Sequence, residues 1–500
     1  MWQKDTAGSR YNGDEHVINR RTVGRLAPQW AFVFPDSDGL QSSQPAVVDG
    51  TVYVGGHNGL LYARDAHTGK TRWSFDTGPV VGAPSPGTPA AGNPLRDGPS
   101  VVGNAVYFGD STGRLYALDR RSGTLRWVTR VDGHPGAILT SSPLVWHGNL
   151  VVGVSSREYM FAADDAYPCC TFRGSVVALD ARTGAVRWQR YTTPAPTRTG
   201  TTSDGVPIWG PSGAAVWSSP AIDPRTGDVF VGTGNNYTGT GGDSDSVLAL
   251  DIRSGATRWA RQMTHPDTWT FQCFNAPNER CPDPGPDIDF GSSPNVFTVQ
   301  GRTVVGIGQK SGVYHVFDSR TGAVVWQANL NTVIDGFASG GIQWGSSFDG
   351  NRIYAATYHS QPGALYALDP ASGRVLWRNP IPADACVTGG AAAHPGECDL
   401  AHISAPSSIS GLVFEGSEDG RVRAYASATG QVLWQYDTVR PYQGTNGLAG
   451  SGGSISGSGG PVIAEGLLFV NSGYWLGTGI RGGVLIAFGV CGGPLDRGDG

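Results

Sequence analysis

The chain has 500 residues, including 75 glycines and 33 prolines, and only 15% of its residues are charged. Its net charge of −5 is small for this length and no block of lysine or arginine occurs, which argues against nucleic acid as the main partner. No run of about 18 apolar residues is present, so we expect no membrane span. The composition predicts a protein rich in turns and strands.

One sequence motif recurs along almost the whole chain. The pattern A-x-D-x-x-[ST]-G-x-x-x-W ends, with small deviations, at seven tryptophans: Trp73, Trp127, Trp188, Trp259, Trp326, Trp377 and Trp434. Short β-rich runs alternate with turn residues inside each repeat, and a period of about 40 to 70 residues is typical of a β-propeller blade. We expect each tryptophan to pack between neighbouring blades.

An eighth copy of the motif is divided between the two ends of the chain. Trp30 follows Gly24-Arg25-Leu26 without the first half of the motif, and residues 482–488 resemble the missing strand. We therefore predict that residues 1–500 form a single all-β domain, an eight-bladed β-propeller. Its last blade is closed by the N- and C-terminal strands, which removes exposed sheet edges.

Irregular insertions interrupt the repeats at residues 82–98, 192–208, 264–289 and 383–402. They are rich in proline, glycine and threonine, so we expect them in surface loops rather than in the core. In a propeller such loops lie on one rim, and these rims carry binding sites.

The cysteines bear on the compartment of the protein. Cys273 and Cys281, and likewise Cys386 and Cys398, are close pairs in loop-like sequence, as extracytoplasmic disulfides often are, while Cys491 is left over. The polar amino end lacks the layout of a signal peptide. We expect a periplasmic or secreted protein from which an export signal has been removed; the alternative is a cytosolic protein with reduced cysteines.

Two further cysteines, Cys169 and Cys170, are adjacent in a segment that does not repeat. Adjacent cysteines favour a strained disulfide ring, which tends to mark a functional site. The alternative is a pair of reduced, buried thiols.

Five segments carry a family resemblance: residues 5–12 (DTAGSRYN), 169–175 (CCTFRGS), 210–217 (GPSGAAVW), 232–237 (GTGNNY) and 285–291 (GPDIDFG). With them the chain resembles, over nearly all of its length, the polyvinyl-alcohol-dehydrogenase branch of the quinoprotein alcohol dehydrogenases, and more distantly the methanol dehydrogenases. The resemblance implies a propeller that holds pyrroloquinoline quinone (PQQ) and a metal ion, Ca²⁺ rather than a lanthanide, on its axis. It also implies oxidation of an alcohol, with secondary and polymeric alcohols among the candidates, by hydride transfer to the quinone.

The resemblance implies roles for a metal-binding and catalytic set. Glu158 matches the metal-binding glutamate of the family, Asn235 matches its amide ligand, and Asp289 would complete the set, since a hard cation prefers carboxylate and amide oxygens. Asp289 also matches the catalytic aspartate, the general base on the alcohol hydroxyl, with Asp287 as the fallback. With Asp287 as the base, a lanthanide site would become possible.

The remaining implied residues would contact the cofactor. Trp217 matches the tryptophan that stacks under the quinone, and Lys310 matches a basic residue that hydrogen-bonds the quinone oxygens. Arg173 and Thr140 are weaker candidates for cofactor contact. The ring contact of Cys169-Cys170 stays open, because methanol dehydrogenases carry their adjacent pair one blade earlier.

Other interpretations remain at this level. Glu158 could be an exposed loop carboxylate, Asn235 a turn residue, Lys310 a solvated lysine, and Asp287 with Asp289 a loop cap or a structural ion site. The whole chain could be a non-catalytic propeller scaffold, similar to outer-membrane assembly proteins, or a propeller enzyme that no longer uses PQQ. No Cys-x-x-Cys-His haem motif occurs, so electrons would leave to a separate acceptor such as a cytochrome c.

Overall fold

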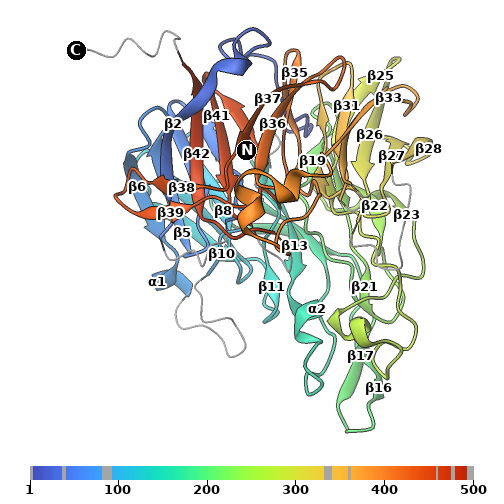
Figure 1. The fold of residues 1–500 in the computed structure, drawn as a ribbon. Coiled ribbons are helices and arrows are strands. Elements are labelled where there is room, and N and C mark those ends of the chain that lie inside the picture. Colours follow the sequence, from blue (N-terminus) through green and yellow to red (C-terminus); the bar gives the residue numbers. More distant parts are fainter. Residues whose placement is uncertain are drawn as a thin grey trace.

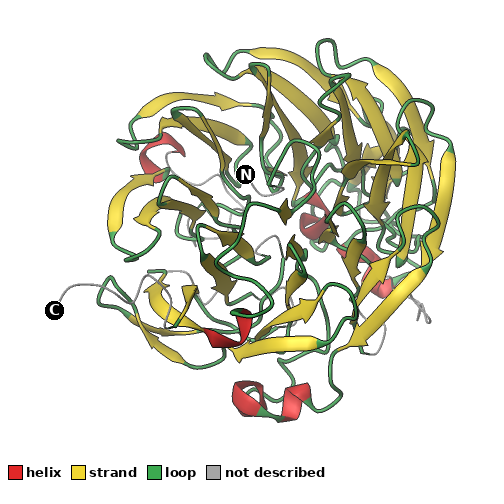
Figure 2. Cartoon of the chain, turned by 90° about the horizontal axis from the view of Figure 1, so that it is seen from above, coloured by secondary structure: helices red, strands yellow, loops and turns green. Residues whose placement is uncertain are grey.

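The computed structural model describes residues 4–35, 41–81, 93–330, 340–358, 362–457, 460–474 and 479–491. Eight antiparallel sheets stand around a central axis like the blades of a propeller (Figure 2). This arrangement confirms the all-β, eight-bladed fold predicted from the repeat. In the described part of the chain, none of the helices has the length and apolar character needed to cross a bilayer.

The blades follow one another in chain order and each is built mainly from four strands. Their bounds are β3 (Ala46–Val48), β4 (Thr51–Gly55), β5 (Leu60–Asp65) and β6 (Thr71–Asp76) in blade 1; β7 (Ser100–Val102), β8 (Ala105–Gly109), β9 (Arg114–Asp119) and β10 (Leu125–Arg130) in blade 2; β11 (Ala137–Ile138), β12 (Leu144–Trp146), β13 (Asn149–Ser156), β14 (Ser175–Asp180) and β15 (Val186–Tyr191) in blade 3; β19 (Ala221–Ile222), β20 (Asp228–Gly232), β22 (Ser246–Asp251) and β23 (Thr257–Gln262) in blade 4.

The second half of the ring continues in the same way. Its strands are β25 (Asn295–Val299), β26 (Arg302–Gly308), β27 (Val313–Asp318) and β28 (Val324–Asn329) in blade 5; β30 (Ser347–Phe348), β31 (Ile353–Ala356), β32 (Ala364–Leu368) and β33 (Val375–Pro380) in blade 6; β34 (Ser407–Ile409), β35 (Leu412–Gly416), β36 (Arg421–Ala426) and β37 (Val432–Asp437) in blade 7; β40 (Val462–Ala464), β41 (Leu467–Ser472), β42 (Val484–Val490) and β2 (Leu26–Val33) in blade 8.

Short elements lie outside the regular blades. They are the strands β1 (Tyr11–Asn12), β16 (Thr197–Thr201), β17 (Pro207–Gly210), β18 (Ser212–Gly213), β21 (Asn236–Thr238), β24 (Ser292–Ser293), β29 (Trp344–Gly345), β38 (Pro441–Gln443) and β39 (Ala449–Ser451), and the helices η1 (Val23–Arg25), α1 (Gly78–Val81), α2 (Glu158–Phe161), η2 (Phe271–Asn275), η3 (Ala385–Val387) and η4 (Gly389–Ala393). The β16–β17 hairpin and α2 project from the same end of the molecule (Figure 1).

The last blade joins the two ends of the chain. The N-terminal strand β2 pairs antiparallel with the C-terminal strand β42, which confirms the predicted closure. The segment before β2 contacts four successive blades. Blades 4, 5, 6 and 7 each donate one backbone N–H group to it, and the acceptors are the carbonyls of Thr6, Ala7, Ser9 and Arg10 in turn.

Each repeat tryptophan connects its blade to the next one. The Nε1 group of Trp188 donates to the carbonyl of Ile252 at 2.8 Å, and all eight motif tryptophans, Trp30 included, make the corresponding bond. The indole also lies on the turn glycine of the next blade, where a Cβ atom at Gly255 would stand 2.6 Å from the Trp188 ring. The predicted packing of tryptophan between blades is therefore confirmed.

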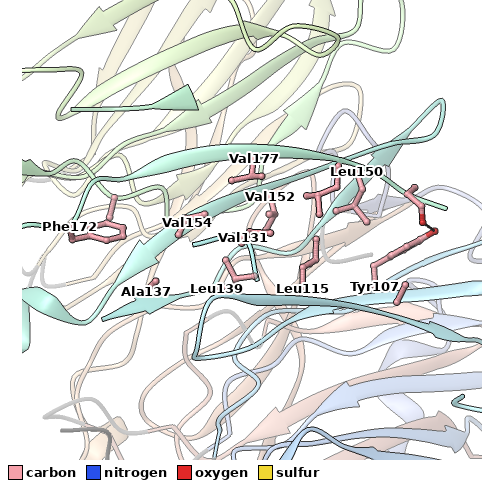
Figure 3. Packing of buried hydrophobic residues seen from close by; sticks show 14 of the residues in the cluster. Tyr107, Leu115, Val131, Ala137, Leu139, Leu150, Val152, Val154, Phe172 and Val177 are labelled. Carbon is pink, nitrogen blue, oxygen red and sulfur yellow. Dashed lines mark hydrogen bonds between the residues drawn. The ribbon is translucent and has the colours of Figure 1, made fainter. Parts of the chain in front are cut away.

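Blade faces pack through alternating apolar residues. Between blades 2 and 3, Val152, Val154 and Val177 pack with Leu115 and Leu139 (Figure 3). Successive residues of a strand point to opposite faces of the sheet. Each blade therefore packs against one neighbouring blade on each face, and its inner strands are buried on both sides.

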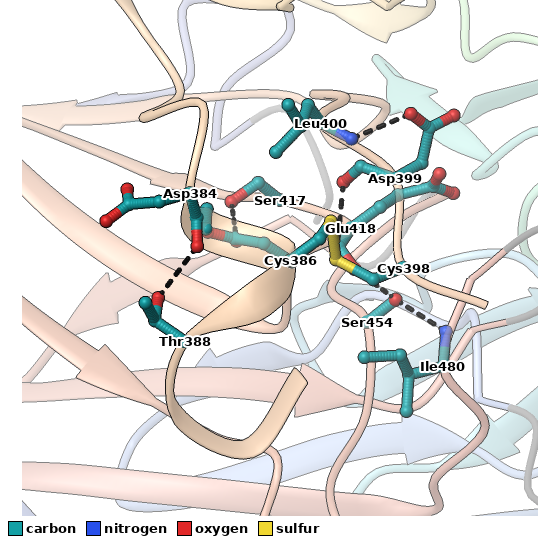
Figure 4. The surroundings of a disulfide bond; sticks show 12 residues. Asp384, Cys386, Thr388, Cys398, Asp399, Leu400, Ser417, Glu418, Ser454 and Ile480 are labelled. Atoms are coloured by element: carbon teal, nitrogen blue, oxygen red, sulfur yellow. Dashed lines mark hydrogen bonds between the residues drawn. A yellow bond between two sulfur atoms is a disulfide. The ribbon is translucent and has the colours of Figure 1, made fainter. Parts of the chain in front are cut away.

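All three predicted cysteine pairs form disulfides: Cys169–Cys170, Cys273–Cys281 and Cys386–Cys398. The bridge between Cys386 and Cys398 closes the 383–402 insertion beside Glu418 and Ser454 of the last two blades (Figure 4). Cys491 is a free, exposed thiol.

Of the 82–98 insertion predicted as a surface loop, residues 82–92 lie outside the described part of the chain.

Candidate active site on the propeller axis

The predicted site residues come from equivalent positions of successive blades. Glu158, Asn235 and Lys310 follow the equivalent strands β13, β20 and β26 of blades 3, 4 and 5, whereas Trp217 and Asp289 precede the first strands, β19 and β25, of blades 4 and 5. Equivalent turns of neighbouring blades emerge at the same end of a propeller, so side chains distant in sequence meet there.

Asp289 is the centre of the cluster. It is only 6% exposed and its carboxylate accepts three hydrogen bonds. The Asn235 backbone N–H donates to Oδ1 at 2.7 Å, and Trp217 Nε1 donates to Oδ2 at 3.1 Å. The Lys310 ammonium lies 2.9 Å from Oδ2. A carboxylate offers about four lone-pair positions, so one acceptor position remains for a further hydroxyl.

Lys310 lies between two carboxylates. Its Nζ atom is 3.0 Å from Asp287 and lies 5.8 Å from the centre of the Trp217 ring. Burial by itself lowers the pKa of Lys310, but the attraction of Asp287 and Asp289 outweighs it and raises the pKa above its ordinary value. Burial raises the pKa of Asp287, while Lys310 lowers it and Asp289 raises it again. One ammonium therefore serves two carboxylates.

The three predicted metal ligands are only partly assembled. Asn235 is next to Asp289, and its Nδ2 group donates to the carbonyl of Trp269 at 2.8 Å. Glu158 is completely buried, so it is not an exposed loop carboxylate. Its oxygens accept the N–H groups of Thr171 and Phe172, each at 2.8 Å. Among the described residues, no group of three or more His, Cys, Asp or Glu side chains is placed to hold a metal.

The weaker candidates for cofactor contact support the site or lie apart from it. Thr140 donates its hydroxyl to the carbonyl of Trp217 at 2.8 Å and so holds that backbone. Arg173 donates to the carbonyl of Thr193 and stacks 3.8 Å from the centre of the Tyr191 ring.

The Cys169–Cys170 disulfide is buried in the blade 3 core, in the cluster that also contains Phe172 and Tyr237. Trp217 packs against this same cluster.

Trp217 also meets Trp344 edge to face at 5.0 Å. It lies so close to Gly291 that a Cβ atom at that glycine would be 1.9 Å from the indole ring. The indole of Trp217 is therefore held on several sides.

Two acidic residues that sequence reasoning missed support the Asp287–Asp289 segment. Asp267 accepts the backbone N–H groups of Asp287 at 3.0 Å and Ile288 at 2.7 Å, and burial raises the pKa of Asp267 to about 6. Asp245 is fully buried, and neither of its carboxylate oxygens has a hydrogen-bond partner in the described structure. Burial, with Asp267 and Asp289 nearby, raises the pKa of Asp245 well above its ordinary value. No motif marks either position in the sequence.

Two arginines were also missed, and they add positive charge around the axis. Arg157 of blade 3 donates to the carbonyl of Ser111 in blade 2 at 3.0 Å. Burial lowers the pKa of Arg157, and Arg96 lowers it further by repulsion. Arg96 and Lys310 both lower the pKa of the Tyr159 hydroxyl, although burial has the larger, opposite effect. Of these cations, Lys310 lies beside the Trp217 ring.

The fold and the family comparison place the chain among the quinoprotein-type β-propellers. The family model described as glucose/ethanol/alcohol dehydrogenase, β-propeller domain, matches residues 1–341. A model of the outer membrane protein assembly factor BamB matches residues 309–487.

Curated relatives give the branch. The chain is 36% identical to a polyvinylalcohol dehydrogenase from Pseudomonas sp. over 94% of this chain and 73% of the relative. It is 34% identical to one from Sphingopyxis sp. over 98% of this chain and 76% of the relative. The chain belongs to the quinoprotein alcohol dehydrogenase family, in the branch of the polyvinyl alcohol dehydrogenases, and is an alcohol-oxidising oxidoreductase.

Solved structures show the same fold. The quinohemoprotein alcohol dehydrogenase of Comamonas testosteroni matches with a TM-score of 0.69 and 20% identity over 98% of this chain and 80% of that structure. A europium-containing methanol dehydrogenase matches with a TM-score of 0.67 and 19% identity over 98% of this chain and 97% of that structure.

Proposed function

We propose that this protein oxidises a secondary alcohol, carried on a polymer chain, with PQQ as its cofactor and Asp289 as the general base. The observation that carries the proposal is the convergence of Asp289, Lys310 and Trp217 on the axis. The names of the two curated relatives favour polyvinyl alcohol as the substrate. PQQ, when bound, supplies the acceptor of the substrate hydride.

The chain itself orients the substrate and takes the proton. The Asn235 N–H and the Trp217 indole fix the Asp289 carboxylate, and its remaining lone pair accepts the alcohol hydroxyl. The Lys310 ammonium is available to donate a hydrogen bond to a quinone oxygen beside the Trp217 face. Arg96 and Arg157, which lie close enough to repel each other, would supply positive charge for the carboxylates of the cofactor.

A divalent cation held by the side-chain oxygens of Glu158, Asn235 and Asp289 would take the place of one of the donors on the Asp289 carboxylate, so that the remaining lone pair still accepts the alcohol hydroxyl. We take Ca²⁺ in preference to a lanthanide. The three disulfides favour a periplasmic or secreted location. Electrons would pass to a separate acceptor such as a cytochrome c.

The first experiment tests cofactor and substrate together. The purified protein is incubated with PQQ and either Ca²⁺ or a lanthanide, and dye reduction is followed with primary, secondary and polymeric alcohols. Turnover of secondary alcohols that depends on PQQ is expected. If the protein neither binds the quinone nor oxidises any alcohol, with Ca²⁺ or with a lanthanide, the proposal is wrong.

Replacement of Asp289 by Asn tests the base. The amide keeps the shape of the side chain but cannot take the proton, so kcat is expected to fall about 10²- to 10⁴-fold while PQQ still binds. Quinone absorbance measures binding and dye reduction measures kcat. The matched variant Asp287→Asn should retain most turnover; if it is the inactive one and Asp289→Asn is active, Asp287 is the base.

A further inference from the structure

A continuous row of aromatic rings leads from the surface toward the axial site. We call Tyr159, Trp269, Phe271 and Phe274 the aromatic shelf. The centroid of Phe274 lies 5.2 Å from Trp269 and 5.3 Å from Phe271, and Phe271 lies 5.3 Å from Tyr159. The shelf joins the 264–289 insertion to α2, which projects from one end of the molecule (Figure 1), and η2 contacts α2.

The outer end of the shelf is exposed to solvent in a fixed position. The Phe274 side chain is 59% exposed, although burying such a ring would be worth about 1.5 to 3 kcal/mol. Phe274 belongs to η2 directly after Cys273, whose disulfide with Cys281 closes the loop over a separation of eight residues. Phe274 is not an isolated exposed ring, because it continues into Trp269 and Phe271, and contiguous exposed apolar surface of this kind marks binding sites.

The inner end of the shelf touches the residues that hold Asp289. The carbonyl of Trp269 accepts the Nδ2 group of Asn235, whose backbone N–H donates to Asp289. Tyr159 is half-buried, and Asp287 and Asp289 both contribute to its raised pKa, after the larger effect of burial. The shelf and the axial cluster are therefore contiguous.

We propose that the aromatic shelf binds the carbon backbone of a polymeric secondary alcohol and leads one hydroxyl-bearing carbon to Asp289. This inference rests on the proposed function. A polyol chain alternates CH₂ groups, which pack on aromatic faces, with hydroxyl groups, which stay hydrated at the open side. A short alcohol that occupies only the axial cluster would not extend to Phe274.

The test compares a polymer with a fragment of the same chemistry. Phe274→Ala is loaded with PQQ and Ca²⁺ and assayed by dye reduction on polyvinyl alcohol and on 2,4-pentanediol. The ratio of kcat/KM for the polymer to that for the diol is expected to fall about tenfold, through a higher KM for the polymer. Phe274→Leu, which keeps an apolar side chain, should lose less. Val387→Ala is the matched control, since Val387 is 74% exposed on the loop closed by the Cys386–Cys398 disulfide.

A second measurement is independent of turnover. Binding of polyvinyl alcohol to the protein without PQQ is followed by isothermal titration calorimetry, and Phe274→Ala is expected to weaken it about tenfold. If this binding is lost but no variant oxidises any alcohol, the proposed function fails and the shelf stands. If the diol and the polymer are affected equally, or polymer binding is unchanged, the shelf proposal is overturned. The shelf proposal is also overturned if Phe274→Ala slows electron transfer to a cytochrome c but leaves dye-linked oxidation of the polymer unchanged. Phe274 would then belong to the surface that contacts the electron acceptor.

Discussion

At the scale of single residues, the site is a balance of buried charges. Asp287, Asp289 and Lys310 are nearly buried, and the ammonium lies against both carboxylates. Burial raises the pKa values of Asp267 and Asp245, and the nearby carboxylate of Asp289 raises them further. Buried charges cost several kcal/mol unless they are paired, so every member of this group depends on the others.

Lys310→Met tests that dependence. The substitution removes the ammonium shared by two carboxylates and is expected to lower the free energy of unfolding by about 3 kcal/mol. Adding Asp287→Asn should recover part of the loss, because the repulsion between the two acids then disappears. Urea unfolding of both single variants and the double variant measures the coupling. Strictly additive effects would contradict the shared ion pair.

Asp245→Asn tests the carboxyl without hydrogen-bond partners. Since the folded pKa of Asp245 is raised, the folded state retains a proton that the unfolded chain loses above about pH 4, and wild-type stability falls as the pH rises from there toward the folded pKa. Asn does not titrate. The Tm of the variant minus that of the wild type should therefore increase between pH 4.5 and pH 8. A constant difference across this range would show that Asp245 does not hold its proton.

At the scale of elements, the docking of tryptophan on glycine links each blade to the next. The turn glycines that face a motif tryptophan combine a positive φ with close contact to the ring, as Gly123 does with φ +70° and a ring atom of Trp73 at 2.7 Å from its virtual Cβ. A methyl group there must displace the indole or the strand that carries it.

The same blade offers a matched pair of glycines. Gly103 has φ +56° and open space around its virtual Cβ, so Gly103→Ala is expected to cost only the backbone penalty of about 1 to 2 kcal/mol. Gly123→Ala adds the clash with Trp73 and should cost about 1 to 3 kcal/mol more. Thermal unfolding of both variants gives the comparison. Equal losses would remove the packing argument.

At the scale of the whole molecule, closure depends on residues from both ends of the chain. β2 contributes the outer strand of blade 8, and its Leu26 carbonyl accepts the indole of Trp434 from blade 7 at 3.1 Å. Without this pairing the ring would present two unpaired edges.

Truncation after Gly483 tests closure. It removes β42, which pairs with both β2 and β41, so we expect loss of cooperative thermal unfolding and association through the free edges. Size-exclusion chromatography and calorimetry measure both effects against the full chain. A monomer with the Tm of the full chain would show that the ring does not need its closing strand.

The sequence predicted some residues of the candidate site, but it did not predict how all of them are placed. Asp289, Trp217 and Asn235 stand in segments that resemble the family, Lys310 matches a basic residue of the family outside those segments, and the structure brings the four together. The burial of Glu158 against its own loop was not visible, because that position depends on hydrogen bonds from residues after the cysteine pair.

The sequence by itself determined the propeller: the period of the motif, the blade count and the split last blade are all local patterns repeated along the chain. Only the tertiary structure decided which groups share the axis. The aromatic shelf and the acids Asp245 and Asp267 come from loops with no motif of their own, and their environment is set by turns of other blades. The physical reason is that strand pairing follows short-range alternation, whereas burial and charge on the axis depend on residues far apart in the chain.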